Sequence, residues 1–489
     1  MSIASDSEPD VDVLDTDAAG LAVVRGGAIR VVCYVVGALI SAGGAALLYH
    51  KLGLVGVGHY VTIASIVAIV SGFSDLGLTA VGLRDSATLN PRQRSELFAD
   101  LLGLRLTLTI LGLLIALPIV SFGYRSMIVF GVLLAGIGLL AQTAQDNLSL
   151  VLQVELRLGS ISILELLRQV LTVLGILLLV LAGAHLLAFV SVAIPVGAVL
   201  LVVAARMVRR QRSLRPKFSW RRWRPLLLRV LPYSAATAAS VLYFRVAVVM
   251  VSQLSTTRQE GLFGASYRII DFLTLVPSVL AGVALPIFSR AASNDPKRFV
   301  YGIGRVFEVG LIVGVGAALC IGIGSPFVLQ VIGGAQYAGA DGVLTIQGIG
   351  LGATFVGIVW ANGLLSLGLY RQIMVLNIAA LAGIVIVLAL LIPDHGAKGA
   401  AVATALGEIC GAVANGVLVM RRHPSLLRCL RVMPRVALAA ALGAASLAIP
   451  GISPFERTIV AGLVYLIALL LVGAIPRELA VLLPRRFGV

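Results

Sequence analysis

Long apolar segments recur along almost the whole chain and are separated by short polar connections. Each runs for about 20 residues, the length that an α-helix needs to cross a hydrocarbon core about 30 Å thick. The pattern predicts an all-α integral membrane protein with about fourteen transmembrane helices. We place these spans at 28–50, 58–83, 98–120, 127–146, 161–182, 185–208, 230–252, 261–289, 300–323, 342–368, 372–393, 397–420, 433–450 and 457–475.

The composition strengthens this prediction. The 489 residues are 59% hydrophobic and only 12% charged, whereas soluble domains are about 45–50% apolar and about a quarter charged. A water-soluble protein is therefore excluded.

The net charge of +16 raises the question of a nucleic-acid partner, so the placement of the 38 Lys and Arg residues matters. Most lie in the connections that are cytoplasmic if the N-terminus is cytoplasmic, and 209–229 alone holds nine. This is the positive-inside asymmetry of membrane proteins. We expect a multi-pass protein of the bacterial cytoplasmic (inner) membrane with both termini in the cytoplasm, anionic membrane lipids as partners and no nucleic acid.

The polar connections divide the chain into parts. Helix two opens with Gly58-His59-Tyr60 and helix eight with Gly261-Leu262-Phe263, each after a short outer loop, which suggests a parallel duplication of six helices. The expected parts are a disordered acidic cytoplasmic tail (1–24), an N-terminal six-helix bundle (25–208), a basic cytoplasmic linker (209–229), a C-terminal six-helix bundle (230–421), and two extra helices with a basic tail (422–489).

The linker mixes Arg with Phe218, Trp220 and Trp223. We interpret it as an anchor on the membrane surface, held by anionic headgroups and interfacial Trp. The alternative is specific recognition of a lipid or a nucleotide.

Charged side chains inside the bilayer cost about 2.5–3.5 kcal/mol each by insertion scales, so they are expected to face protein or water. Arg245 and Arg268 both lie about eight residues from the outer loop at 253–260, on the order of 12 Å deep at about 1.5 Å per residue. Asp271 lies one turn deeper than Arg268 on the same helix face. Because Arg suits phosphate or carboxylate, we hypothesise an anion-binding cavity between the halves. The alternative is a structural pair of Arg268 and Asp271, with Arg245 reaching out to the interface.

Four other charged positions lie nearer the cytoplasmic side. Arg30 and Asp75 are at similar depth and are candidates for an inner gate, or for a static salt bridge. Arg105 and Arg168 each lie about seven residues inside their helices. They would extend a basic path for the substrate or reach out to the headgroups.

Glu308 and Glu408 are candidates for proton or sodium coupling, because a carboxyl group in an apolar setting titrates nearer neutrality. The scattered histidines and the cysteines have no metal-ligand spacing, so we expect neither a metal nor a cofactor. The sequence lacks GxGxxG opening a helix after a strand, GxxxxGK[ST], HExxH and GxSxG. We therefore expect a protein that is not an enzyme.

Four segments follow one another along the chain: GHYVTIASIVAIVSGFSDLGL at 58–78, YFRVAVVMVSQLSTTRQEGLFGASYRIIDFLTLVPSVLAGVALPIFSR at 243–290, IGGAQYAGADGVLTIQ at 332–347 and LNIAALAGIVIVLALLIPDHGAKGAAVATALGE at 376–408. In this order they resemble Wzx-type polysaccharide flippases of the multidrug/oligosaccharidyl-lipid/polysaccharide (MOP) exporter superfamily, over about residues 26–475. The chain departs from the family at Val246 and Ala247, where the family often has an acidic residue after the Arg of helix seven. A coupling role carried over to that place is therefore not supported.

The resemblance implies two six-helix bundles in a V-shaped arrangement, like that of MATE transporters, plus two C-terminal helices. It implies alternating access and a polyprenyl-pyrophosphate-linked oligosaccharide, a polysaccharide repeat unit, as cargo. It also implies a polysaccharide polymerase and glycosyltransferases as partners.

Three other functions compete with this one. A peptidoglycan-precursor (lipid II) flippase shares the architecture and an anionic cargo. A multidrug cation antiporter of the same fold would require acidic residues in the cavity. A membrane-embedded glycosyltransferase or polymerase usually needs a sizeable charged outer loop, and the longest one here, 324–341, has no charge before Asp341.

Overall fold

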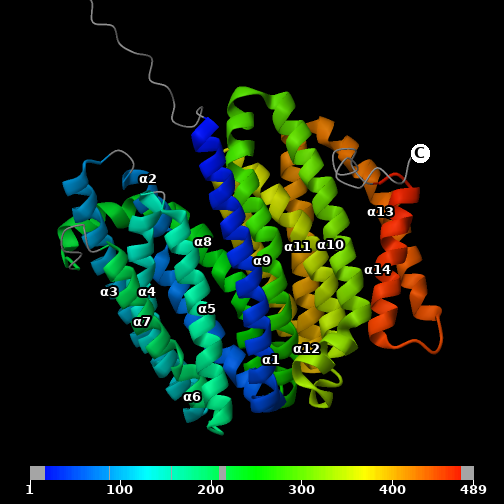
Figure 1. The fold of residues 1–489 in the computed structure, drawn as a ribbon, viewed down its shortest axis with the longest axis horizontal. Helices are drawn as coiled ribbons and strands as arrows, with labels where there is room; N and C mark the ends of the chain where they lie inside the picture. Colours follow the sequence, from blue (N-terminus) through cyan, green and yellow to red (C-terminus); the bar gives the residue numbers. More distant parts are fainter. Residues whose placement is uncertain (1–16, 87–88, 156, 209–215, 475–489) are drawn as a thin grey trace, which may run out of the picture.

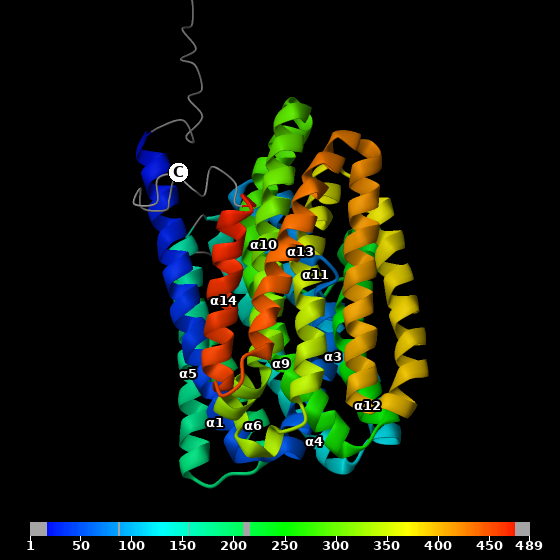
Figure 2. The same ribbon diagram turned by 90° about the vertical axis from the view of Figure 1, so that its right-hand side faces the viewer.

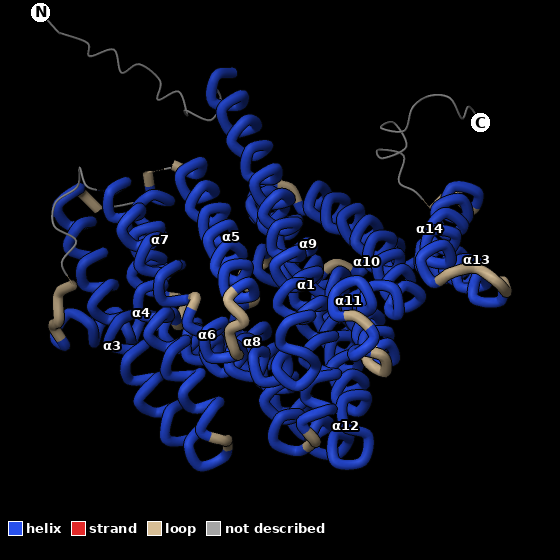
Figure 3. The backbone as a smooth tube through the Cα atoms, turned by 60° about the horizontal axis from the view of Figure 1, so that its bottom comes forward, coloured by secondary structure: helices blue, strands red, loops and turns tan. Residues whose placement is uncertain are grey.

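The computed structural model describes residues 17–86, 89–155, 157–208 and 216–474, which form helices joined by short connections (Figure 1). No strand occurs in these ranges (Figure 3). The elements are α1 (Asp17–Asp75), α2 (Leu78–Ser86), α3 (Pro91–Gly123), α4 (Ser126–Val154), α5 (Leu158–Leu181), α6 (Leu186–Ser191), α7 (Ala193–Val208), α8 (Trp220–Leu254), α9 (Thr257–Asn294), α10 (Pro296–Gly333), η2 (Ala335–Tyr337), α11 (Asp341–Ser366), α12 (Tyr370–Arg422), η3 (Pro424–Val432), α13 (Met433–Ala444), η4 (Ala445–Ala448) and α14 (Pro454–Leu471).

The predicted number of spans is confirmed. Eleven helices of the described residues are long and apolar enough to cross a membrane. Two of them, α1 and α12, each consist of two helical segments, because the backbone is not helical at Gly53 (φ 68°) and Gly396 (φ 53°). These left-handed values favour glycine, which has no Cβ to clash. The 38-residue α9, between α8 and α10, covers the predicted span 261–289.

Some predicted boundaries are wrong. Residues 17–24, expected in the disordered tail, form the start of α1, whose Ala and Leu residues favour helix, and the rest of the tail lies outside the described residues. The expected span 58–83 is broken at Leu76 (φ 42°) and Gly77 (φ 77°), which separate α1 from α2. Residues 220–229, expected in the linker, belong to α8.

The start of α8 lies against the N-terminal half. Trp223 is buried, and its ring would lie 3.2 Å from a Cβ at Gly103 of α3. By contrast, Phe218 and Trp220 are about two-thirds exposed, at 66% and 67%. Two aromatic side chains are therefore free to lie in the membrane interface, as an anchor requires.

The helices form two groups joined along α1, α8 and α9, and both described ends of the chain lie on one side of the molecule (Figure 1). The opposite side, which carries the turns at Gly53 and Gly396, is called the distal side below. The pair α13 and α14 packs outside the C-terminal group against α10 (Figure 2). There the Tyr465 hydroxyl donates to the Ile312 carbonyl at 2.8 Å.

The two halves meet on the distal side. Gly58 and Gly261, which open the two proposed repeats, face each other so closely that a Cβ at Gly58 would lie 2.9 Å from the Gly261 nitrogen. Nearby, Tyr49 of α1 stacks on Tyr337 of η2 at 5.6 Å, and its hydroxyl lies 3.4 Å from the Ala265 carbonyl oxygen. The structure is therefore closed on its distal side.

Candidate functional site

Arg245 and Arg268 converge on one carboxylate. They belong to α8 and α9, which run antiparallel from the turn at Ser255 and Thr256, so positions equally far from the turn face each other. Arg245 Nη1 lies 3.3 Å from Asp271 Oδ2, and Arg268 Nη1 lies 3.2 Å from the same oxygen. The two arginines therefore lie at the same level of α8 and α9, and two positive charges share one negative charge.

The cluster of Arg245, Arg268 and Asp271 is accessible, with exposed side-chain fractions of 24%, 51% and 26%. The Arg245 guanidinium lies over the Tyr267 ring, 5.7 Å from its centroid, and the Tyr267 hydroxyl donates to the Phe244 carbonyl. Arg245 is thus held by a carboxylate and an aromatic face and does not reach out to the interface. Asp271, which both arginines contact, also lines the adjoining cavity, whereas the arginines themselves lie beside its lining.

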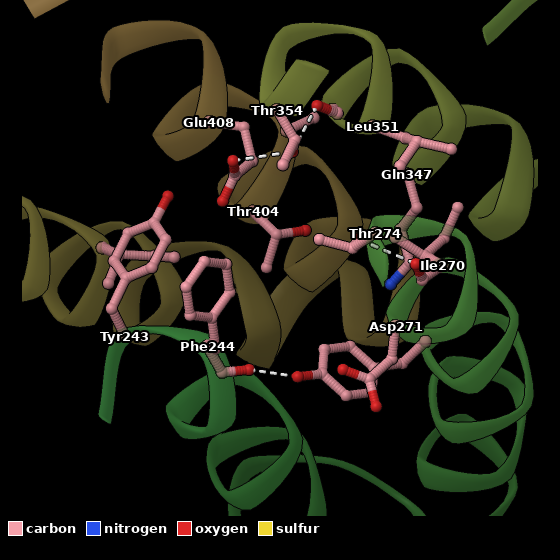
Figure 4. Close-up of a pocket in the computed structure, with 14 residues that line it drawn as sticks. Tyr243, Phe244, Ile270, Asp271, Thr274, Gln347, Leu351, Thr354, Thr404 and Glu408 are labelled. Atoms are coloured by element: carbon pink, nitrogen blue, oxygen red, sulfur yellow. Dashed lines mark hydrogen bonds between the residues drawn. The ribbon is translucent and has the colours of Figure 1, made fainter. Parts of the chain in front are cut away.

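This cavity lies inside the C-terminal half, between α8, α9, α11 and α12 (Figure 4). Asp271 and Glu408 both line it. A second cavity of about 440 Å³ adjoins it, shares Tyr243, Phe244, Thr354 and Glu408 with it, and has mostly uncharged polar and small side chains around it. Besides the shared residues, the polar members of that second lining are Thr237, Ser240, Asn377 and Asn415.

Glu408 stands at the junction of the two cavities. Its Oε2 accepts a hydrogen bond from the Thr354 hydroxyl at 2.7 Å, and the two side chains point toward each other in Figure 4. Among the described residues no Lys or Arg lies within ion-pair distance of Glu408. It differs in this from Glu308, which pairs with Arg305 one turn earlier on α10 at 2.7 Å.

Asp75 is bound by Arg105. The Arg105 side chain is only 7% exposed and contacts the Asp75 carboxylate at the break between α1 and α2. The Thr79 hydroxyl, in the first turn of α2, also donates to Asp75 at 2.6 Å. Arg105 therefore does not reach out to the headgroups. The Arg30 side chain lies outside the described part of the chain, so its pairing with Asp75 stays a prediction.

We expect Arg105→Met to destabilise the protein by about 2 kcal/mol, because removing one partner of a largely buried ion pair leaves the other uncompensated. The value lies below that for a fully buried pair because Asp75 is 35% exposed. Thermal unfolding in detergent measures the change. Arg305→Met, which removes a more exposed pair within one helix, should cost under about 1 kcal/mol. Equal losses in the two variants would contradict the expectation.

Arg168 of α5 is paired as well. Its Nη2 contacts Gln145 and lies 3.2 Å from Asp146 Oδ1 on α4. Arg105 and Arg168 thus each have a carboxylate partner, and neither adds an uncompensated charge to a basic path. Their role as substrate ligands stays a prediction.

Sequence reasoning missed a polar contact between the halves on the distal side. Glu260 of α9 is 5% exposed; the Thr62 hydroxyl of α1 donates to its Oε1 at 2.7 Å, and His59 Nε2 lies 3.7 Å from its Oε2. The sequence places Glu260 only at the edge of an outer loop. The available signal was the repeat itself, since His59 and Glu260 flank the two glycines that open it. Within the described residues no group of three or more His, Cys, Asp or Glu is arranged to hold a metal ion.

The arrangement of helices is similar to that of several solved membrane transporters. "Lipid II flippase MurJ, inward closed conformation" is similar with a TM-score of 0.73 over 92% of this chain and 99% of that one, at 11% identity. An inward-facing multidrug resistance MATE family transporter of the MOP superfamily gives 0.60 over 82% and 99%, at 14% identity. An outward-facing structure described in the same words gives 0.56 over 82% and 96%, at 16% identity. These likenesses show that the chain shares the fold of these transporters.

The family follows from the sequence. A family model described as "Polysaccharide biosynthesis protein" matches residues 56–341. The chain belongs to this family, and the predicted resemblance to Wzx-type MOP proteins is confirmed. No curated protein sequence matches the chain significantly.

Proposed function

We propose that this protein is a flippase that moves a polyprenyl-pyrophosphate-linked oligosaccharide across the cytoplasmic membrane by alternating access. The observation that carries the proposal is the convergence of Arg245 and Arg268 on the single carboxylate of Asp271 beside an accessible cavity. A surplus positive charge favours an anionic headgroup and disfavours a cationic drug. The family match to polysaccharide biosynthesis supports a sugar-bearing cargo.

The mechanism follows from what the bilayer excludes. The polyprenyl tail stays in the hydrocarbon, while the pyrophosphate and sugars need a polar route, because charged groups are costly at bilayer depth. The arginines receive the pyrophosphate, which competes with Asp271 for their N–H donors. No covalent bond forms or breaks. With both termini cytoplasmic, as the positive-inside rule predicts, the distal side faces outward and is closed in the observed state.

A second candidate cargo is lipid II. It is the cargo named for the solved lipid II flippase MurJ, which aligns with 92% of this chain at a TM-score of 0.73. Its headgroup also carries pyrophosphate, so the arginine cluster would serve both lipids. The distinction lies in the sugar and peptide parts beyond the pyrophosphate.

The test is a reconstitution of the purified full chain in liposomes with fluorescent polyprenyl-linked substrates. We expect flipping of the pyrophosphate-linked oligosaccharide and much slower flipping of a polyprenyl glycoside that lacks phosphate. Preference for lipid II over the oligosaccharide would favour the second candidate. Exchange of an organic cation for protons, without movement of either lipid, would overturn both.

We propose Glu408 as the coupling carboxylate, because it lines both cavities and no described Lys or Arg neutralises it. Glu408→Gln keeps a partner for the Thr354 hydroxyl and removes the charge. We expect at least a tenfold loss of flipping driven by a proton or sodium gradient, while exchange without a gradient persists. Glu308→Gln, which affects a carboxylate already paired with Arg305, is the matched control. Gradient-driven flipping that is unchanged in Glu408→Gln would contradict the assignment.

A further inference from the structure

The distal contact between the halves holds a buried carboxylate with few partners. Glu260 lies in the first turn of α9 and is 5% exposed. Its one short hydrogen bond comes from the Thr62 hydroxyl, and His59 lies beside its other oxygen at 3.7 Å. Both of these neighbours belong to α1, so every polar contact made here spans the two halves of the protein.

Close backbone packing encloses the Glu260 side chain. Gly58 and Gly261 lie one position from His59 and Glu260, and a Cβ at Gly261 would lie 2.5 Å from the Leu54 carbonyl oxygen. Val57 and Phe263, which flank the contact, are fully buried. The Glu260 carboxylate, whose side chain is only 6% exposed, is therefore poorly solvated while the distal side is closed.

The closed contact therefore requires a proton. A buried carboxylate with one neutral hydroxyl donor is costly as an anion unless a positive charge compensates it. Either His59 is protonated and forms an ion pair with Glu260, or Glu260 is protonated and His59 is neutral. In both forms the pair holds one proton.

Opening the distal side changes that proton count. Once exposed to water, the carboxyl group and the imidazole return toward their ordinary pKa values of about 4.3 and about 6.5. At neutral or higher pH the separated side chains then hold less than one proton between them. The closed state thus binds more protons than the open state, so raising the pH favours opening.

Other titratable groups near the pair come from every neighbouring element. Tyr124 and Arg125, at the connection of α3 and α4, act electrostatically on Glu260 and His59 respectively. Arg258 lies two residues before Glu260 on α9 and is exposed. The adjacent Gln259 is uncharged and accepts a hydrogen bond from the Ala397 nitrogen of α12 at 3.0 Å. None of these groups is a second carboxylate that would take over the proton.

We propose that His59 and Glu260 form a proton-binding site that locks the distal side closed and releases its proton when that side opens. This inference rests on the alternating access of the proposed function. With the distal side outward, an acidic exterior returns the proton and recloses the protein, so proton binding resets it after the cargo has left.

The experiment measures the distance across the distal side without any cargo. Spin labels at Phe122→Cys and Asp394→Cys, both exposed distal positions on opposite halves, report closure in nanodiscs when the native cysteines are replaced. If one proton is released each time the distal side opens, the ratio of open to closed molecules should rise about tenfold per pH unit. This slope applies above the pH at which the two states are equally populated. Glu260→Gln, which needs no proton and still accepts from Thr62, should stay closed from about pH 5.5 to about 8.5.

Matched variants distinguish this site from a general pH effect. Asp341→Asn removes an exposed distal carboxylate and should keep the wild-type pH dependence. His59→Gln should weaken closure at low pH, because the Glu260 carboxyl group alone must then hold the proton. The proposal is overturned if wild type shows no pH dependence or if Glu260→Gln keeps all of it. The distances are measured without cargo, so this experiment tests the proton site even if the flipping assay fails.

Discussion

Replacing Arg268 with alanine should slow flipping of a pyrophosphate-linked oligosaccharide about 10- to 100-fold. A hydrogen bond to a charged group contributes about 1.5–3 kcal/mol, and each 1.4 kcal/mol is about tenfold. Arg268 is the more exposed of the two arginines on Asp271, with 51% of its side chain exposed. In the double variant Arg245→Ala/Arg268→Ala, the flipping rate should fall more than about 100-fold, because the Asp271 carboxylate is then unpaired and repels the anionic cargo. Initial flipping rates in proteoliposomes, at equal protein incorporation, measure both effects.

Two further variants make this prediction specific. Arg258→Ala removes an exposed arginine near the start of the same helix and should change the rate less than twofold. Asp271→Asn frees both arginines, so we expect tighter binding of the pyrophosphate-linked lipid and slower release. Equal losses in Arg258→Ala and Arg268→Ala would indicate a general effect of net charge. Weaker binding by Asp271→Asn would show that the carboxylate orients the arginines rather than competing with the cargo.

Replacing Gly261 with valine should prevent closure of the distal side and reduce flipping more than tenfold. The new Cβ would lie 2.5 Å from the Leu54 carbonyl oxygen and 2.9 Å from the Leu54 carbonyl carbon. Cβ atoms in proteins do not come this close to other heavy atoms. The two Leu54 atoms belong to the backbone, so a change of side-chain rotamer cannot relieve the clash. The two halves must therefore separate at this contact, which traps the protein with its distal side open.

Labelling of a buried cysteine measures that opening. Val61→Cys, placed at a position that is 3% exposed, should react with a membrane-impermeant maleimide much faster in the Gly261→Val background. Gly43→Val is the control on α1, since no atom lies within 4 Å of its Cβ position. Slow labelling in the Gly261→Val protein, together with normal flipping, would show that the Gly58 and Gly261 contact is not needed for closure.

The sequence by itself determined the membrane class, the number of spans and the shared depth of Arg245 and Arg268. These properties depend on local quantities: the length of an apolar run, the rise of a helix per residue, and the mirror relation of two helices about a short turn. Asp271 could be added because a spacing of three residues returns to the same helix face. The resemblance to MOP flippases was likewise carried by contiguous segments, and the family match confirms it.

Partners between distant segments were decided only by the tertiary structure. The sequence offers Asp75 several cations of similar depth, and packing brought α3 next to the break after Asp75, so that Arg105 became its partner. Glu408 and Thr354 are 54 positions apart, and no periodicity relates them. His59 and Glu260 are about two hundred residues apart in the chain. They meet because α1 and α9 pack closely at Gly58 and Gly261. Hydrophobic pattern fixes which segments enter the membrane, but the packing of side chains between helices decides which polar groups meet there.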